Sequence, residues 1–184
     1  MGKRLIVQRR GRGTSTYRAN SFRNLGEVKH RYYDEIEKAN DIHGKVVDLV
    51  HCPGHSAVLA IVRYENGETC AMFASKGLST KNVVTSGALA SVEAGNTLPL
   101  KNIPLGTNVY NVESRVGDGG KFVRVAGTSA TVVAKTKNKV LVQFPSKKQK
   151  SFNENCRATI GIIAGTEKKE KPFVKAGKRF HAMK

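Results

Sequence analysis

Short apolar runs separated by turn signals fill residues 43–165, and this pattern constrains the fold more than any other feature of the sequence. Residues 56–64 are almost continuously apolar, which is typical of a buried central strand. The dipeptide Asn66-Gly67 follows as a strong hairpin signal, and residues 69–74 are predicted to return as the partner strand. Turn signals about every 8–12 residues predict small β-barrels.

The rest of this region is predicted to form further short strands joined by loops. We expect these strands at residues 43–51, 83–84, 106–113, 122–125, 130–134, 140–144, 150–153 and 156–163, with turns at 117–120, 136–139 and 145–148. Residues 96–104 contain two prolines and no clear period, so they are predicted to link two barrels. Barrels of about 60 residues are marginal alone, and we expect them to pack on each other or on a partner.

The charge of the chain is strongly positive and unevenly placed. Its 184 residues include 32 Lys and Arg against 14 Asp and Glu, a formal net charge of +18. Residues 1–23 contribute +7 without a single acid, residues 166–184 contribute +5, and the β region 39–165 contributes +7 over a much greater length. Such a charge on a compact body repels itself, so binding to a polyanion is the natural explanation.

The arginine-rich stretch at residues 9–18 has no hydrophobic period and is predicted to be disordered in isolation. Its arginines suit bidentate phosphate binding, and its glycines allow the backbone to approach a partner closely. A merely solubilising tail is the alternative, which seven cations without one anion disfavour.

Several classes of protein are disfavoured by the sequence. No run approaches about 18 apolar residues, so we expect no transmembrane helix and no membrane partner. Residues 1–12 lack the apolar segment of a secretory signal. The cysteines at positions 52, 70 and 156 are odd in number and far apart, which is typical of a reducing compartment.

Two local motifs contain residues suited to ligand binding. Residues 117–121 (GDGGK) lack the spacing and the following helix of a phosphate loop, which leaves an RNA-facing loop or a plain turn. Residues 51–55 (HCPGH) place three possible metal ligands on one turn, yet no second pair completes a zinc site, and a turn whose His55 contacts RNA is favoured. No nucleophile–base set or carboxylate pair is recognisable, so we expect no enzyme, cofactor or small-molecule substrate.

Basic side chains recur near the predicted loops of the β region. The alternatives are a merely solvated basic face and a surface that follows RNA phosphates, and the charged tails favour the second. A free-standing nucleic-acid chaperone or a translation-factor-like OB module is the competing class, but such a module needs exposed stacking aromatics, and this region has few.

Four motifs in order resemble the universal ribosomal protein L2 (uL2) family of the large subunit. They are residues 95–107 (GNTLPLKNIPLGT), Gly119-Gly120, residues 124–130 (RVAGTSA) and residues 156–161 (CRATIG). Residues 108–113 (NVYNVE) and 144–148 (FPSKK) resemble its archaeal and eukaryotic branch. The resemblance covers essentially the whole chain.

The resemblance implies a mostly β fold, an OB-like barrel followed by an SH3-like barrel, with basic irregular N- and C-terminal extensions that enter large-subunit rRNA. It implies a structural role in the cytoplasmic ribosome, in assembly, subunit association and support of the peptidyl-transferase region, beside neighbouring ribosomal proteins. It also implies one RNA-binding arginine in each barrel; Arg124 holds the position in the second, and His55 stands at that of the first.

The family continues past a segment like residues 175–178 into a glycine-rich extension with a histidine, whereas this sequence ends at Lys184, so we expect a truncated chain. The predicted division is a basic extension (1–38), an OB-like barrel (39–95), a linker (96–104), an SH3-like barrel (105–165) and a basic tail (166–184). The predicted RNA-binding residues are Arg4, Arg9, Arg10, Arg12, Arg18, Arg23, His55, Lys121, Arg124, Lys147, Lys148, Lys150, Arg157, Lys175, Lys178 and Arg179.

Overall fold

A computed structural model describes residues 2, 3, 5, 7–8, 12–15, 17–18 and 21–183. Strands dominate it, so the predicted mostly β fold is confirmed. The strands are β1 (Asp41–His51), β2 (Val58–Tyr64), β3 (Thr69–Phe73), β4 (Val83–Gly87), β5 (Thr97–Pro99), β6 (Asn108–Tyr110), β7 (Ala130–Thr136), β8 (Lys139–Gln143), β9 (Gln149–Asn153) and β10 (Arg157–Ile160). The helices are short: η1 (Ser21–Arg23), α2 (Glu35–Ala39), η2 (Leu100–Asn102), η3 (Thr166–Lys169) and α3 (Ala176–Met183).

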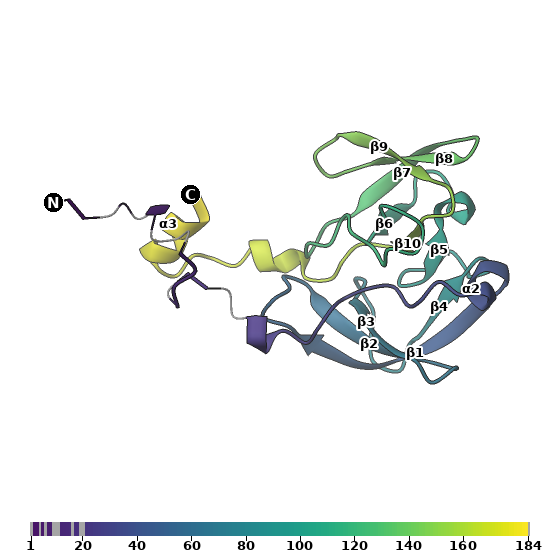
Figure 1. The fold of residues 1–184 in the computed structure, drawn as a ribbon, viewed down its shortest axis with the longest axis horizontal. Coiled ribbons are helices and arrows are strands. Elements are labelled where there is room, and N and C mark those ends of the chain that lie inside the picture. Colours follow the sequence, from purple (N-terminus) through teal and green to yellow (C-terminus); the bar gives the residue numbers. More distant parts are fainter. Residues whose placement is uncertain are drawn as a thin grey trace.

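One continuous sheet runs through the described residues, in the order β3-β2-β1-β4-β5-β10-β6-β7-β8-β9. Figure 1 shows two halves, with β1 to β4 at the bottom of the view and β5 to β10 above them. Neighbouring strands are antiparallel except for the parallel pair β4–β5, which joins the halves. This arrangement agrees with the expected OB-like and SH3-like barrels.

The hairpin predicted at Asn66-Gly67 is confirmed. Arg63 of β2 lies opposite Thr69 of β3, and Gly67 adopts φ +84° in the turn between them. That conformation is readily accessible to glycine and costly for most other residues, so the Asn-Gly pair fixes the register of the two strands.

Residues 96–104, predicted to link the two barrels, form a strand and a short helix where no regular element was expected. Thr97–Pro99 is strand β5, which pairs with both β4 and β10. Leu98, Leu100 and Ile103 are buried in the core of the second half. Pro99 lies at the end of its strand, where a missing N–H is tolerated.

The strand predicted at residues 122–125 is also absent, although these residues are fully described. Only Phe122 makes a single bridge, to Val112. Val123 has φ +56°, in the left-handed region, and this conformation prevents an extended strand from continuing.

The hydrophobic core continues across the two halves. A cluster that includes Cys52, Leu59 and Phe73 of the first half also contains Tyr110 and Ile163 of the second. The hydroxyl of Tyr110 donates to the carbonyl of Phe73 at 3.1 Å. Packing of the two halves on each other, expected from their small size, is therefore observed.

Part of the predicted N-terminal extension belongs to the folded body. Val28, His30, Arg31 and Glu37 are buried, and Glu37 lies on α2. Asp34 caps that helix, because its carboxylate accepts the backbone N–H of Glu37 at 2.9 Å. The segment after residue 27 therefore positions side chains in the interior rather than extending into solvent.

Candidate nucleic-acid interface

The structure brings together the two residues that the family resemblance marks, His55 and Arg124. His55 lies in the turn after β1, and Arg124 lies in the irregular segment before β7. Phe73 separates them: the guanidinium carbon of Arg124 is 5.0 Å from its ring centroid, and the His55 ring meets it edge-on at 5.8 Å. One residue from each half therefore contributes to a single place on the molecule.

Arg124 also holds the N-terminal segment in place. Its Nη2 donates to the carbonyl of Val28 at 2.6 Å, and its Nη1 donates to the carbonyl of Gly120 at 3.3 Å. Burial lowers the pKa of this half-buried guanidinium, but an arginine remains charged at neutral pH. These bonds use two of its five N–H donors, so Arg124 can position a chain segment and still meet a phosphate.

His55 offers an uncharged ring at neutral pH. Burial, and then the nearby charge of Arg124, lower its pKa from the ordinary value of 6.5. Its Nδ1 lies 3.2 Å from the Sγ of Cys52, which fixes the ring above the turn. Such a ring can stack or hydrogen-bond, but it carries no charge with which to pair an anion.

The burial of Arg157 contradicts its prediction as an RNA contact. Its side chain is 1% exposed, so a phosphate cannot reach it. Its Nη2 donates to Glu113 at 2.7 Å, its Nη1 donates to Glu37 at 3.0 Å, and the guanidinium lies 4.6 Å from the centroid of Tyr33. This arginine is an internal partner of two carboxylates.

Arg157 belongs to a network of four buried charged residues, which we call the buried network. Its members are Arg31, Glu37, Glu113 and Arg157. Arg31 donates to the second oxygen of Glu37 at 2.8 Å, and Ser86 donates its hydroxyl to the first at 2.6 Å. The network thus joins the N-terminal segment to both halves of the sheet. Sequence reasoning missed it, because nothing local distinguishes these charges from exposed ones.

The predicted hairpin lysines are exposed around the β8–β9 turn. Lys147 adopts φ +65°, and the tight turn is closed by the backbone N–H of Phe144 donating to Lys148 at 2.9 Å. Lys150 projects its ammonium over Phe122, 4.3 Å from the ring centroid. Lys121 is 64% exposed and lies 3.7 Å from Asp118, a separation that leaves it accessible to a stronger anion.

The described residues before Val28 and those after Gly165 are exposed where their burial is given, and Figure 1 shows these two segments on the same side of the body. The predicted contacts among them are Arg12, Arg18, Arg23, Lys175, Lys178 and Arg179. Arg4, Arg9 and Arg10 lie outside the described residues. The basic extensions are therefore positioned to engage the same partner from one direction.

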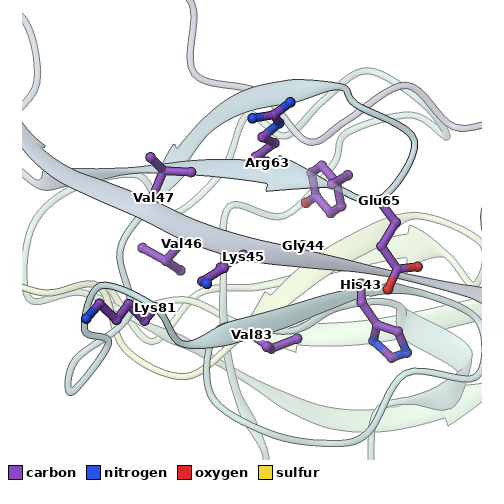
Figure 2. Close-up of a pocket in the computed structure, with 10 residues that line it drawn as sticks. His43, Gly44, Lys45, Val46, Val47, Arg63, Glu65, Lys81 and Val83 are labelled. Atoms are coloured by element: carbon purple, nitrogen blue, oxygen red, sulfur yellow. The ribbon is translucent and has the colours of Figure 1, made fainter.

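A further set of cations was missed by the sequence analysis. Lys45, Arg63 and Lys81 lie around a hollow formed by β1, β2 and β4, as Figure 2 shows. Exposed and buried residues alternate along β1, and Lys45 lies opposite Arg63 in the pairing of β1 with β2. The alternation and this pairing together could have placed Lys45 and Arg63 on one face of the sheet.

Two alternative sites receive no support from the described residues. No group of three or more His, Cys, Asp or Glu side chains in this part of the chain is placed to hold a metal ion. Among the same residues, no helix is long and apolar enough to cross a bilayer.

Comparison with known proteins identifies the family. The family model "Ribosomal Proteins L2, RNA binding N-terminal domain" matches residues 2–86, and "Ribosomal Proteins L2, C-terminal domain" matches residues 93–184. The chain belongs to the ribosomal protein L2 family. Its resemblance to the archaeal branch of uL2 is also confirmed by individual relatives.

Three archaeal relatives carry the name "Large ribosomal subunit protein uL2". Those of Methanosphaera stadtmanae and Methanothermobacter thermautotrophicus are 49% and 50% identical over 184 residues, which is 100% of this chain and 76% of each relative. That of Methanococcus vannielii is 50% identical over 183 residues, which is 100% of this chain and 77% of the relative. The similarity to uL2 therefore includes both halves of the sheet and both basic extensions.

Proposed function

We propose that this protein is a structural constituent of the large ribosomal subunit that binds large-subunit rRNA. The observation that supports this proposal is the match to uL2 relatives over the whole chain, including the extensions. Its site of action is the cytoplasmic ribosome, where it supports assembly, subunit association and the peptidyl-transferase region without being an enzyme. Its partners are rRNA and neighbouring ribosomal proteins.

The proposed RNA interface consists of three exposed groups of cations. The first is the junction of His55 and Arg124, the second is the β8–β9 hairpin, and the third comprises both extensions. Arginine and lysine on such surfaces neutralise phosphates and release counterions, which provides most of the affinity and makes it depend on salt. Arg157 is excluded from this interface by its burial.

The burial of four aromatic side chains of the β region disfavours the competing free-standing OB module. Tyr64, Phe73, Tyr110 and Phe152 are 5%, 1%, 0% and 3% exposed. A sequence-tolerant module that binds single strands relies on rings on which bases can stack. These rings instead fill the cores of the two halves.

A filter-binding titration against purified large-subunit rRNA tests the proposal. We expect K147Q/K148Q to weaken binding and to make the log–log salt slope less negative by about 1.4–1.8, since each phosphate contact contributes about 0.7–0.9. The matched control K76Q/K101Q removes the same charge from exposed lysines outside the interface and is expected to bind like the wild type.

Sedimentation of cell extract at moderate salt provides the second readout. The tagged protein is expected to migrate with large subunits. Recovery only at the top of the gradient, together with a flat salt profile in vitro, contradicts the proposed function.

A further inference from the structure

The outer face of the first half carries an open hollow of about 740 Å³. In Figure 2, Lys45 lies on the central strand β1, with Arg63 on one neighbouring strand and Val83 on the other. A hollow of this size lies within the range of about 300–1,000 Å³ that is usual for ligand sites. The strands β1, β2 and β4 lie at the bottom of Figure 1, whereas the β8–β9 hairpin lies at the top.

Lys45, Arg63 and Lys81 form what we call the β1 face, and all three are exposed. Lys45 lies directly opposite Arg63 in the β1–β2 register. The backbone N–H of Lys81 donates to the carbonyl of Val46 at 2.8 Å, which ties the third cation to β1. Within the described part of the chain, none of these three cations forms an ion pair. The residues that line the hollow include one acid, Glu65, against the three cations.

This arrangement opposes folding in two ways. Like charges directly opposite each other on neighbouring strands destabilise a sheet. Lys81 also adopts φ +74°, a left-handed conformation that few non-glycine residues adopt and that often marks functional sites. The left-handed turn at Lys81 supports its backbone hydrogen bond to Val46. Among the described residues, however, no ion pair uses the charges of Lys45, Arg63 and Lys81, whereas an anionic ligand would be attracted by all three.

We propose that the β1 face binds backbone phosphates of RNA, as a further contact surface of the protein. The proposal rests on the proposed function, because that function supplies the RNA. Val47 and Val83 are 56% and 63% exposed and form an uncharged floor between the cations, and Glu65 is the one acid among the residues that line the hollow. Two rings line the hollow: Tyr64 is only 5% exposed, and the exposed ring of His43 lies 3.1 Å from the Thr85 hydroxyl through its Nδ1. The three cations therefore supply most of the exposed polar groups, which favours contact with phosphate.

An acidic protein segment is the other anion that could lie here, and the face fits it less well. Protein interfaces derive most of their affinity from large anchors buried in deep, well-packed pockets. This hollow is open, and its exposed apolar groups are two valines at separate strand positions. The phosphates of an RNA backbone can be bound by cations spaced along a surface. β1, β2 and the loop before β4 present cations spaced in this way.

The test compares K45Q/R63Q with the matched control K76Q/K101Q in the full chain, using purified large-subunit rRNA as the probe. K45Q/R63Q is expected to raise the urea midpoint, because a repulsive pair is removed. It is expected to weaken rRNA binding about 5- to 30-fold and to make the salt slope less negative by about 1.4–1.8. The control is expected to change neither the urea midpoint nor the affinity.

The two readouts move in opposite directions, which a merely structural role for these cations does not produce. Lys81→Gly adds a second variant: it removes a cation and relieves the positive φ, so it too is expected to stabilise the fold while weakening binding. A gain in stability with unchanged rRNA affinity overturns the proposal. The proposed function fails separately, when wild type and K147Q/K148Q alike show no salt-dependent binding.

Discussion

Arg157 illustrates how a single residue can be misjudged when its charge is considered without its partners. It lies in a motif that resembles an RNA-binding family, yet its guanidinium is enclosed by Glu37 and Glu113. We expect Arg157→Met to destabilise the fold by about 3–5 kcal/mol, because Glu113 is left buried without a countercharge and Glu37 keeps only Arg31 as its cationic partner. Urea unfolding followed by circular dichroism measures this loss.

The control for that variant is Lys147→Met, which replaces an exposed cation in the β8–β9 turn. Its effect on stability is expected to remain within about 0.5 kcal/mol. A loss of less than about 1 kcal/mol for Arg157→Met contradicts the view that the buried network depends on this residue.

His30 gives the protein a predicted sensitivity to acid. Burial lowers its pKa to about 4, with the charge of Arg157 as a further cause, and the ring lies 2.7 Å from the carbonyl of Asn111. An unfolded histidine titrates near pH 6.5, so between about pH 6.5 and 4 the unfolded state binds the proton and the folded state does not. Stability is therefore complete above this window and falls as the pH is lowered through it.

The expected loss from this one residue between pH 7.5 and pH 4 is about 3 kcal/mol. The measurement is the unfolding free energy of wild type minus that of His30→Gln, whose amide can still donate to Asn111. Subtraction removes the contribution of the carboxylates that titrate in the same range. A difference that stays constant between pH 7.5 and pH 4.5 rules out the proposed effect of His30.

Residues near one another in the sequence were the predictable ones. The lysines of the β8–β9 turn follow from a local turn signal, and the structure leaves them exposed as expected. The buried network was not predictable, since Arg157 and Glu37 are 120 positions apart and both types of side chain usually lie on the surface. Likewise, nothing in the sequence placed His55 and Arg124 around the same phenylalanine.

Among the strands, those bounded by tight turns were predicted and the one without a local partner was missed. β2, β3, β8 and β9 belong to hairpins, in which turn chemistry and alternation specify the pairing. β5 is only three residues long and pairs with β10, far along the chain, so Pro99 and the nearby Pro104 dominated the sequence pattern. The pairing that defines such a strand exists only in the folded molecule.

The N-terminal segment divides into two elements with different roles. Phe22 is 78% exposed, and the described residues before it are exposed as well. Removal of residues 1–23 is therefore expected to preserve the fold while weakening rRNA binding and reducing its salt dependence, because seven cations are lost. Circular dichroism and filter binding measure the two effects.

Removal of residues 1–39 is the matched comparison. This longer deletion also takes away Arg31, Glu37 and α2, and it leaves Arg157 without one of its carboxylates. It is expected to unfold the protein or to lower its stability by several kcal/mol. Equal stability of the two deletions contradicts the assignment of residues 28–39 to the folded body.

At the scale of the whole molecule, the two halves are joined by three independent connections. The sheet passes from β4 to β5, a hydrophobic cluster contains side chains of both halves, and the buried network joins both to the N-terminal segment. Barrels of about 60 residues are marginally stable alone, so most of their stability depends on these shared contacts. We therefore expect the protein to unfold in a single cooperative transition.

Urea unfolding with two probes distinguishes one transition from two. Far-ultraviolet circular dichroism reports on the whole sheet, and tyrosine fluorescence reports on buried rings, which include Tyr64 in the first half and Tyr110 in the second. Coincident midpoints are expected, and Arg157→Met is expected to lower both together. Separate transitions, of which Arg157→Met shifts only one, would show that the halves fold independently. In that case the buried network would orient two pre-formed domains, and the RNA surfaces of each half would survive its loss.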